Sequence, residues 1–287
     1  MNKKISVLLI SPDFFSGIGS MARHIANSMT DANCYFYSSA DIKRHKNEFL
    51  KLATSVDIIH WLANLSWVKL PSELDIHTFQ SPTIATIHHV NEGLRGYGEK
   101  EESLKIACAS ECNAIQVESR EWLEFVRSKT NTPVFLAHQA INLSQFIQNR
   151  QIKRPRNPFQ IGTFGFSREI KDRKRLDVLL DALYILIKKN YQFELVVQGP
   201  FWNILASSFL SRGIPIRNLG YLPPGLALKS YRYLDLYVCS SDIEGGPLPV
   251  LEALASGVPV VSTPVGVATE ALSMGGGFWL RREILKI

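Results

Sequence analysis

The sequence is poor in cysteine and has no long apolar run, and each shortage excludes a class of protein. No stretch approaches the roughly 20 consecutive apolar residues that a membrane-spanning helix needs. The four cysteines have no metal-ligand spacing, and Cys108 and Cys112 lack a second pair, so we interpret them as core thiols in a reducing compartment. No Asp-x-Asp metal motif, short internal repeat or low-complexity tract is present. The sequence is therefore typical of a globular cytoplasmic protein.

The basic excess of the chain limits its partners. The 287 residues carry a formal net charge of +6, which suits anionic ligands or peripheral contact with a membrane surface. No nucleic acid partner is expected, because the basic residues are not interleaved with aromatic side chains on which bases could stack. A chain of this length is long for one core and fits two domains of ordinary size.

Short apolar runs alternate with helical patterns along the chain. This alternation predicts an α/β protein with parallel, doubly wound sheets. The predicted strands are Ile5–Ile10, Val56–His60, Thr83–Ile87, Ala114–Val117, Val134–Leu136, Phe159–Phe164, Phe193–Val197, Leu234–Cys239 and Val258–Ser262. The predicted helices are Ser20–Met29, Lys43–Leu52, Glu101–Cys112, Arg120–Lys129, Arg175–Lys189, Leu205–Ser211, Leu226–Tyr233 and Pro247–Ala255.

A polar, basic stretch with two prolines, Gln148–Pro158, interrupts this alternation. We interpret it as a linker between two Rossmann-like domains, residues 1–150 and 151–287. In such sheets ligands bind beyond the carboxyl ends of the strands, so polar residues in the loops at that edge are the candidate site residues.

Two glutamates eight positions apart, Glu244 and Glu252, are the strongest candidates. The glycine pair between them lets backbone N–H groups approach a ligand, and the helix start that follows attracts anions. Glu244 would be a loop carboxylate, and Glu252 would lie about one and a half turns into the helix. Two acceptors around such a turn suit a nucleotide sugar, although ordinary surface glutamates are the simpler alternative for a bare pair. The intervening residues expected at the donor are Gly245, Gly246, Pro247 and Leu248.

The segment Ser241–Glu270 resembles the donor-binding core of glycosyltransferase family 4, retaining enzymes of the GT-B fold. It contains the pattern E-G-x-P-L-P-x-x-E, followed by G-x-P-V-V. The resemblance implies that Glu244 lies against the donor sugar and that Glu252 binds the ribose hydroxyls. Members of that family continue for several dozen residues more, so the resemblance also implies a second domain shortened at its C-terminus.

A basic loop, Phe166–Arg175, follows the first predicted strand of the second domain. Such charge clusters are usually solvated surface. This loop, however, leaves the carboxyl end of a strand, where cations can neutralise a diphosphate. The family has an arginine and a lysine here. The resemblance assigns the lysine to Lys174, and the nearest substitute for the arginine is Arg168, with Arg173 behind it.

Shorter matches occur elsewhere. His88 ends the strand Thr83–Ile87 and matches the histidine of the family's His-Asp pair, whereas His89 replaces the aspartate. A lone histidine is otherwise more often structural. Gly17 and Gly19 follow the first strand, where the family has a Gly-rich loop near the donor phosphates, but a bare turn explains them equally well. The other residues that the resemblance assigns to the donor are Gly199, Tyr221 and Leu222.

Taken together, the resemblance implies a retaining glycosyltransferase with residues 1–150 on the acceptor side and residues 151–287 binding the donor. Its partners would be a nucleoside-diphosphate sugar and a hydroxyl acceptor, either a glycan or lipid-linked, and no metal or other cofactor is expected. Two alternatives stay open. One is a non-catalytic homologue that binds a nucleotide sugar or a partner protein. The other is a nucleotide-sugar epimerase, for which the first domain shows no clear carboxylate pair. The predicted catalytic residues are Glu244, His88, Arg168 and Lys174.

Overall fold

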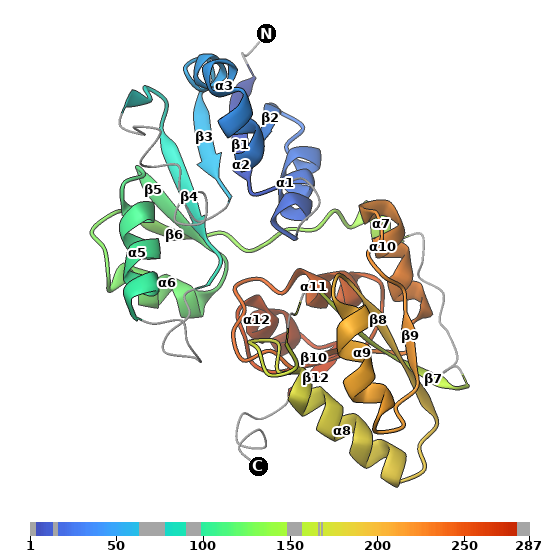
Figure 1. Ribbon diagram of the computed structural model, residues 1–287. Coiled ribbons are helices and arrows are strands. Elements are labelled where there is room, and N and C mark those ends of the chain that lie inside the picture. The colour runs from blue at the N-terminus through green and yellow to red at the C-terminus, as the bar shows by residue number, and fades with distance from the viewer. Residues whose placement is uncertain are drawn as a thin grey trace. The chain divides into compact units, whose positions relative to one another are not determined.

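The computed structural model describes residues 4–13, 17–62, 78–89, 99–147, 157–165, 167 and 169–279. The chain divides into two compact units, Met1–Asn142 and Leu143–Ile287, and each is built around its own sheet (Figure 1). Most of the predicted linker, residues 148–156, lies outside the described residues. None of the described helices is long and apolar enough to cross a bilayer.

In the first unit, the described residues form a six-stranded parallel sheet of order β2-β1-β3-β4-β5-β6. Strand β1 lies between β2 and β3, and Leu8, Leu9 and Ile10 are all buried, because helices cover both faces of a doubly wound sheet. The strands are β1 Ile5–Ser11, β2 Ala32–Ser38, β3 Ile58–Trp61, β4 Thr83–Ile87, β5 Ala114–Val117 and β6 Val134–Leu136. The helices are α1 Gly17–Ser28, α2 Ser39–Arg44, α3 Lys46–Ala53, α5 Glu99–Ser110 and α6 Arg120–Arg127.

In the second unit, the described residues form another six-stranded parallel sheet, of order β12-β11-β10-β7-β8-β9. Its strands are β7 Phe159–Phe164, β8 Phe193–Gln198, β9 Ile216–Asn218, β10 Leu236–Cys239, β11 Val260–Ser262 and β12 Gly277–Trp279. Its helices are α7 Ser144–Ile147, α8 Leu176–Lys188, α9 Trp202–Leu210, α10 Pro224–Ser230, the 3₁₀ turn η2 Tyr231–Tyr233, α11 Leu248–Ala255 and α12 Val267–Ser273.

The predicted doubly wound α/β class is confirmed, and all nine predicted strands are present within a few residues of their bounds. The sequence missed β2, β9 and β12. Two of these have only three residues, and β2 mixes polar with apolar positions at the edge of its sheet. The single predicted helix Lys43–Leu52 is wrong, because His45 adopts non-helical angles (φ −126°, ψ 44°) and separates α2 from α3.

Successive residues of β8 belong to two apolar cores on opposite faces of the second sheet. Leu195 and Val197 pack with α8 and α9. Val196 lies on the other face, in a cluster that includes Tyr231 and Val250. The period-2 alternation of a strand therefore places α11, which carries Glu252, on a different face of the sheet from α8.

Glycine is required at the carboxyl end of β8. Gly199 has φ +129°, and a Cβ built on it would lie 2.2 Å from the carbonyl oxygen of Gly165. Its N–H donates to the carbonyl of Gly220 at 3.0 Å. The loops that follow β7, β8 and β9 thus meet backbone to backbone at this edge.

We expect Gly199→Ala to lower the free energy of unfolding by more than about 2 kcal/mol, since it adds a backbone clash to an unfavourable φ. Gly213→Ala is the matched control, because Gly213 also has a positive φ (+74°) but open space around its Cα. Chemical denaturation of both variants would measure the difference. Equal destabilisation would show that the close approach to Gly165 costs nothing.

Candidate active site

The carboxylate of Glu244 is the centre of the candidate site. Its side chain is only 7% exposed, and it follows β10 in the loop that leads to α11. Lys174 Nζ donates to its Oε1 at 2.6 Å, and Arg173 Nη1 donates to its Oε2 at 2.7 Å. Ser241 Oγ adds a third hydrogen bond at 2.8 Å. A buried carboxylate needs such partners to stay charged, and here both of its oxygens have a cationic donor.

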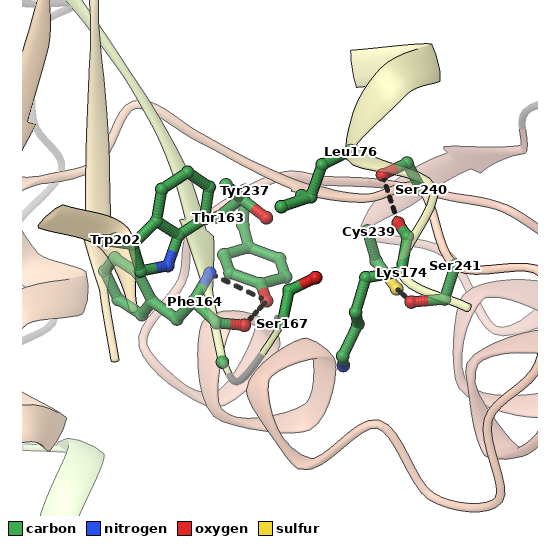
Figure 2. A pocket seen from close by; sticks show the side chains of 11 residues that line it. Thr163, Phe164, Ser167, Lys174, Leu176, Trp202, Tyr237, Cys239, Ser240 and Ser241 are labelled. Atoms are coloured by element: carbon green, nitrogen blue, oxygen red, sulfur yellow. Dashed lines mark hydrogen bonds between the residues drawn. The ribbon is translucent and has the colours of Figure 1, made fainter. Parts of the chain in front are cut away.

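The two loops that supply these groups are joined by their backbones as well. The N–H of Asp242 donates to the carbonyl of Arg173 at 2.8 Å. The hydroxyl of Ser240 donates to the carbonyl of Lys174 at 2.8 Å, a contact drawn in Figure 2. The loop after β7 and the loop after β10 therefore form one unit at the carboxyl edge of neighbouring strands.

Arg175, the N-cap residue of α8, also links the loop after β7 to the loop after β10. It has left-handed backbone angles (φ 48°, ψ 48°), which turn the chain sharply into the helix. Its guanidinium binds Asp177 at 3.0 Å and Asp242 at 3.0 Å. The side chain is thereby drawn toward these two aspartates, while Arg173 and Lys174 reach Glu244.

Electrostatics favour the charged form of Arg173. The Glu244 carboxylate raises the pKa of the Arg173 guanidinium, mainly through its negative charge and then through the hydrogen bond between them. A buried ion pair of this kind is costly to break on one side only, because the remaining charge is left without compensation. We name the group of Glu244, Lys174 and Arg173 the glutamate clamp.

Glu252, the second motif glutamate, lies in α11 and is 8% exposed. The hydroxyl of Tyr231 donates to its Oε2 at 2.7 Å. Tyr231 comes from η2, before β10, so its approach to the motif is visible only in the folded structure.

The glycine turn between the two glutamates is held in place by the start of α12. The N–H of Val267, at the start of α12, donates to the carbonyl of Gly245 at 2.9 Å. A Cβ on Gly266 would lie 2.0 Å from that same carbonyl oxygen, so this position also needs glycine. Helix α11 begins at Leu248, with Pro247 at its cap, one residue later than the sequence predicted.

A small cavity lies beside the clamp, under the loops (Figure 2). Its volume of about 20 Å³ is far too small for a nucleotide sugar. Figure 2 shows Lys174 on one side and Trp202 on the other, with the Tyr237 hydroxyl against the backbone of Phe164. That hydroxyl lies 3.4 Å from Phe164 N and donates to Phe164 O at 3.3 Å.

The other predicted donor residues of this unit line the same edge. Gly199 follows β8, and Tyr221 and Leu222 follow β9 in the segment whose Gly220 accepts from Gly199. Tyr221 is 56% exposed. These residues therefore surround the carboxyl ends of β8 and β9, next to the loop of the clamp.

In the first unit, His88 follows β4 and pairs with a carboxylate that the sequence did not single out. Its Nδ1 lies 3.0 Å from Oε2 of Glu118, and its Nε2 donates to the carbonyl of Leu62 at 2.6 Å. Burial alone would lower the pKa of His88, but the charge of Glu118 and both hydrogen bonds raise it above its usual value. These surroundings therefore favour the protonated form of the His88 ring.

Gly17 and Gly19 lie within the first turn of α1, because the helix begins three residues before its predicted start. Arg168 lies outside the described residues, so its predicted role stays a prediction. Arg173, only the second choice from the sequence, is the arginine that meets Glu244. Within the described ranges, no group of three or more His, Cys, Asp or Glu could hold a metal ion.

Three comparisons place these features among known proteins. Residues 148–283 match the family model of the glycosyl transferases group 1. The lipopolysaccharide core biosynthesis mannosyltransferase LpsB of Rhizobium meliloti is 30% identical over 122 residues. That alignment covers 40% of this chain and only 34% of the mannosyltransferase.

The fold is shared with solved structures of other proteins. Anabaena HepE in complex with UDP and glucose superposes with a TM-score of 0.70 at 15% identity, covering 96% of this chain and 85% of HepE. Sucrose-phosphate synthase from Thermosynechococcus elongatus gives a TM-score of 0.72 at 15% identity, with 96% and 86% covered. The chain therefore has the two-domain GT-B fold, and residues 148–283, which make up most of its second unit, match the model of the glycosyl transferases group 1.

Proposed function

We propose that this protein transfers a sugar from a nucleoside-diphosphate sugar to a hydroxyl group of a glycan or lipid-linked acceptor, with retention of configuration at the anomeric carbon. The observation that carries the proposal is the glutamate clamp, in which a buried carboxylate holds two cations at the carboxyl edge of the second sheet. The match to group 1 glycosyl transferases over the same unit supports it.

The clamp suits a diphosphate leaving group. An ammonium has three N–H donors and a guanidinium has five, so Lys174 and Arg173 can bind phosphate oxygens while they keep their bonds to Glu244. Glu244 would fix both cations in place before the donor arrives, which removes the cost of ordering them during the reaction. Glu252 would accept hydrogen bonds from the ribose hydroxyls.

In the proposed reaction, the bond between the anomeric carbon and the leaving phosphate oxygen breaks, and the acceptor oxygen bonds to that carbon on the same face. The proton of the acceptor hydroxyl passes to an oxygen of the leaving diphosphate. His88 is not the base in this scheme, since its Nε2 donates to the carbonyl of Leu62 and its Nδ1 faces the Glu118 carboxylate. The protein mainly stabilises charge and positions the donor.

The names of the relatives support a sugar nucleotide as donor and a sugar as acceptor. HepE was solved with UDP and glucose, and LpsB is a mannosyltransferase of lipopolysaccharide core biosynthesis. We propose that the first unit binds the acceptor, and that the protein works in the cytoplasm with peripheral membrane contact when the acceptor is lipid-linked.

The direct test is a panel of UDP-, GDP- and ADP-sugars, assayed for released nucleoside diphosphate with and without glycan and lipid-linked acceptors. Release with at least one donor, and transfer with retained anomeric configuration by NMR, is the expected result. Nucleotide binding without turnover would instead identify a non-catalytic homologue. Inversion of configuration at a carbon of the donor sugar, without transfer of that sugar to an acceptor, would identify an epimerase.

Glu252→Ala should weaken binding of the donor nucleotide by roughly ten- to a hundredfold, because a hydrogen bond to a charged group contributes about 1.5–3 kcal/mol. Calorimetry with the matching nucleoside diphosphate measures this. Glu124→Ala is the control, since that side chain is 79% exposed in the first unit. Unchanged affinity in a folded Glu252→Ala variant would remove Glu252 from the site.

Lys174→Ala and Arg173→Ala should each lower kcat/KM by about 10²–10³, the usual loss when one donor to a developing charge is removed. Lys189→Ala, at the exposed end of α8, controls for loss of a surface cation. Arg168→Ala decides between the two arginines. A loss confined to Arg168→Ala would show that Arg173 serves only to hold Glu244.

Activity should survive EDTA, because Lys174, Arg173 and the amino end of α11 together offset the charge that develops on the diphosphate. Turnover would be measured before and after chelation, with magnesium and manganese added back. Loss of turnover with EDTA and recovery with either ion would show that the leaving group needs a divalent cation.

A further inference from the structure

Tyr231 and Glu252 form a buried polar contact whose two members come from different elements. Tyr231 is 2% exposed and Glu252 is 8% exposed. The phenol donates to Oε2 of the carboxylate at 2.7 Å. Because η2 and α11 lie on either side of β10 in the chain, the tyrosine hydroxyl restrains the glutamate from outside its own helix.

The ring of Tyr231 is itself held in place. Its centroid lies 4.9 Å from that of Phe164 and 6.0 Å from that of Tyr237, and these two rings lie 5.8 Å apart. Aromatic pairs at these separations prefer defined tilts. All three rings belong to the apolar cluster that also contains Val250 and Ala253 of α11.

The Tyr231 hydroxyl acts toward Glu252 as a hydrogen-bond donor. Burial and the neighbouring Glu252 carboxylate raise the pKa of Tyr231 well above its usual value, so it stays protonated. A neutral phenol that donates a hydrogen bond stabilises the charged carboxylate without neutralising it. The hydrogen bond from Tyr231 therefore favours the charged form of the nearly buried Glu252 carboxylate.

We infer that Tyr231 is a positioning residue for donor recognition: its hydroxyl fixes the orientation of the Glu252 carboxylate so that the carboxylate can accept from the ribose hydroxyls of the nucleotide. The inference rests on the proposed function. A carboxylate has about four lone-pair sites, so the bond from Tyr231 is compatible with simultaneous acceptance from a ribose.

The experiment measures binding of UDP, GDP and ADP and of their 2′-deoxy counterparts to the full chain by calorimetry. Wild type should prefer the ribonucleotide. Tyr231→Phe keeps the ring and removes the hydroxyl. It should lower the binding affinity for the ribonucleotide by about tenfold and change the affinity for the 2′-deoxynucleotide much less. A role limited to stability would weaken both nucleotides equally, or neither.

Tyr237→Phe is the matched control. It removes a buried hydroxyl from the same aromatic cluster, but one that contacts the backbone of Phe164 and not Glu252. It should keep the wild-type preference for the ribonucleotide. Loss of that preference to the same degree in both variants would overturn the inference.

The Tyr231→Phe change is also tested in the Glu252→Ala variant. In it the Tyr231→Phe change should have no further effect on ribonucleotide affinity, because the two residues act as one unit. An additive loss would show that Tyr231 acts independently of Glu252 and would overturn the inference. This comparison needs only Glu252→Ala and the double variant, so it remains available if Tyr231→Phe alone does not fold. If wild type binds none of the three nucleotides, the proposed function itself fails.

Discussion

The ion pairs of Glu244 with Lys174 and Arg173 are the interaction on which the second unit's functional edge depends. One buried carboxylate fixes two cations, at 2.6 and 2.7 Å, and the same loops are joined by the backbone bond from Asp242 to Arg173. Removing Glu244 would take the shared carboxylate away from both cations, which is unfavourable because Lys174 and Arg173 are partly buried. The loop after β7 and the loop after β10 are therefore held in one arrangement before any ligand binds.

The two motif glutamates differ in their surroundings, and this difference separates their proposed roles. Glu244 is surrounded by cations and a hydroxyl, so its charge is largely used inside the protein. Glu252 accepts a hydrogen bond from the neutral phenol of Tyr231. Cations ordered by a carboxylate suit phosphate oxygens, whereas a carboxylate can itself accept from neutral hydroxyl donors such as those of a ribose.

The first unit presents a different kind of polar pair. The Nε2 of His88 donates to the carbonyl of Leu62, and its Nδ1 lies 3.0 Å from the buried Glu118 carboxylate. The pKa of the neighbouring His60 is shifted the other way: burial and then the charge of His88 lower it to about 4. The surroundings of these two histidines thus shift their pKa values in opposite directions, and only for His88 do they favour the protonated form.

The sequence alone determined the elements whose cause is local. The apolar runs fixed the position of all nine predicted strands, and the pattern from Glu244 to Glu252 marked the glycine turn and the start of α11, because strand burial and turn chemistry depend on residues close together in the chain. Tertiary structure decided the partners. Arg173 and Lys174 meet Glu244 across 71 and 70 positions of sequence, and Tyr231 meets Glu252 across 21. No spacing rule encodes those distances, since they arise only when β7 and β10 pair side by side and bring their carboxyl ends together.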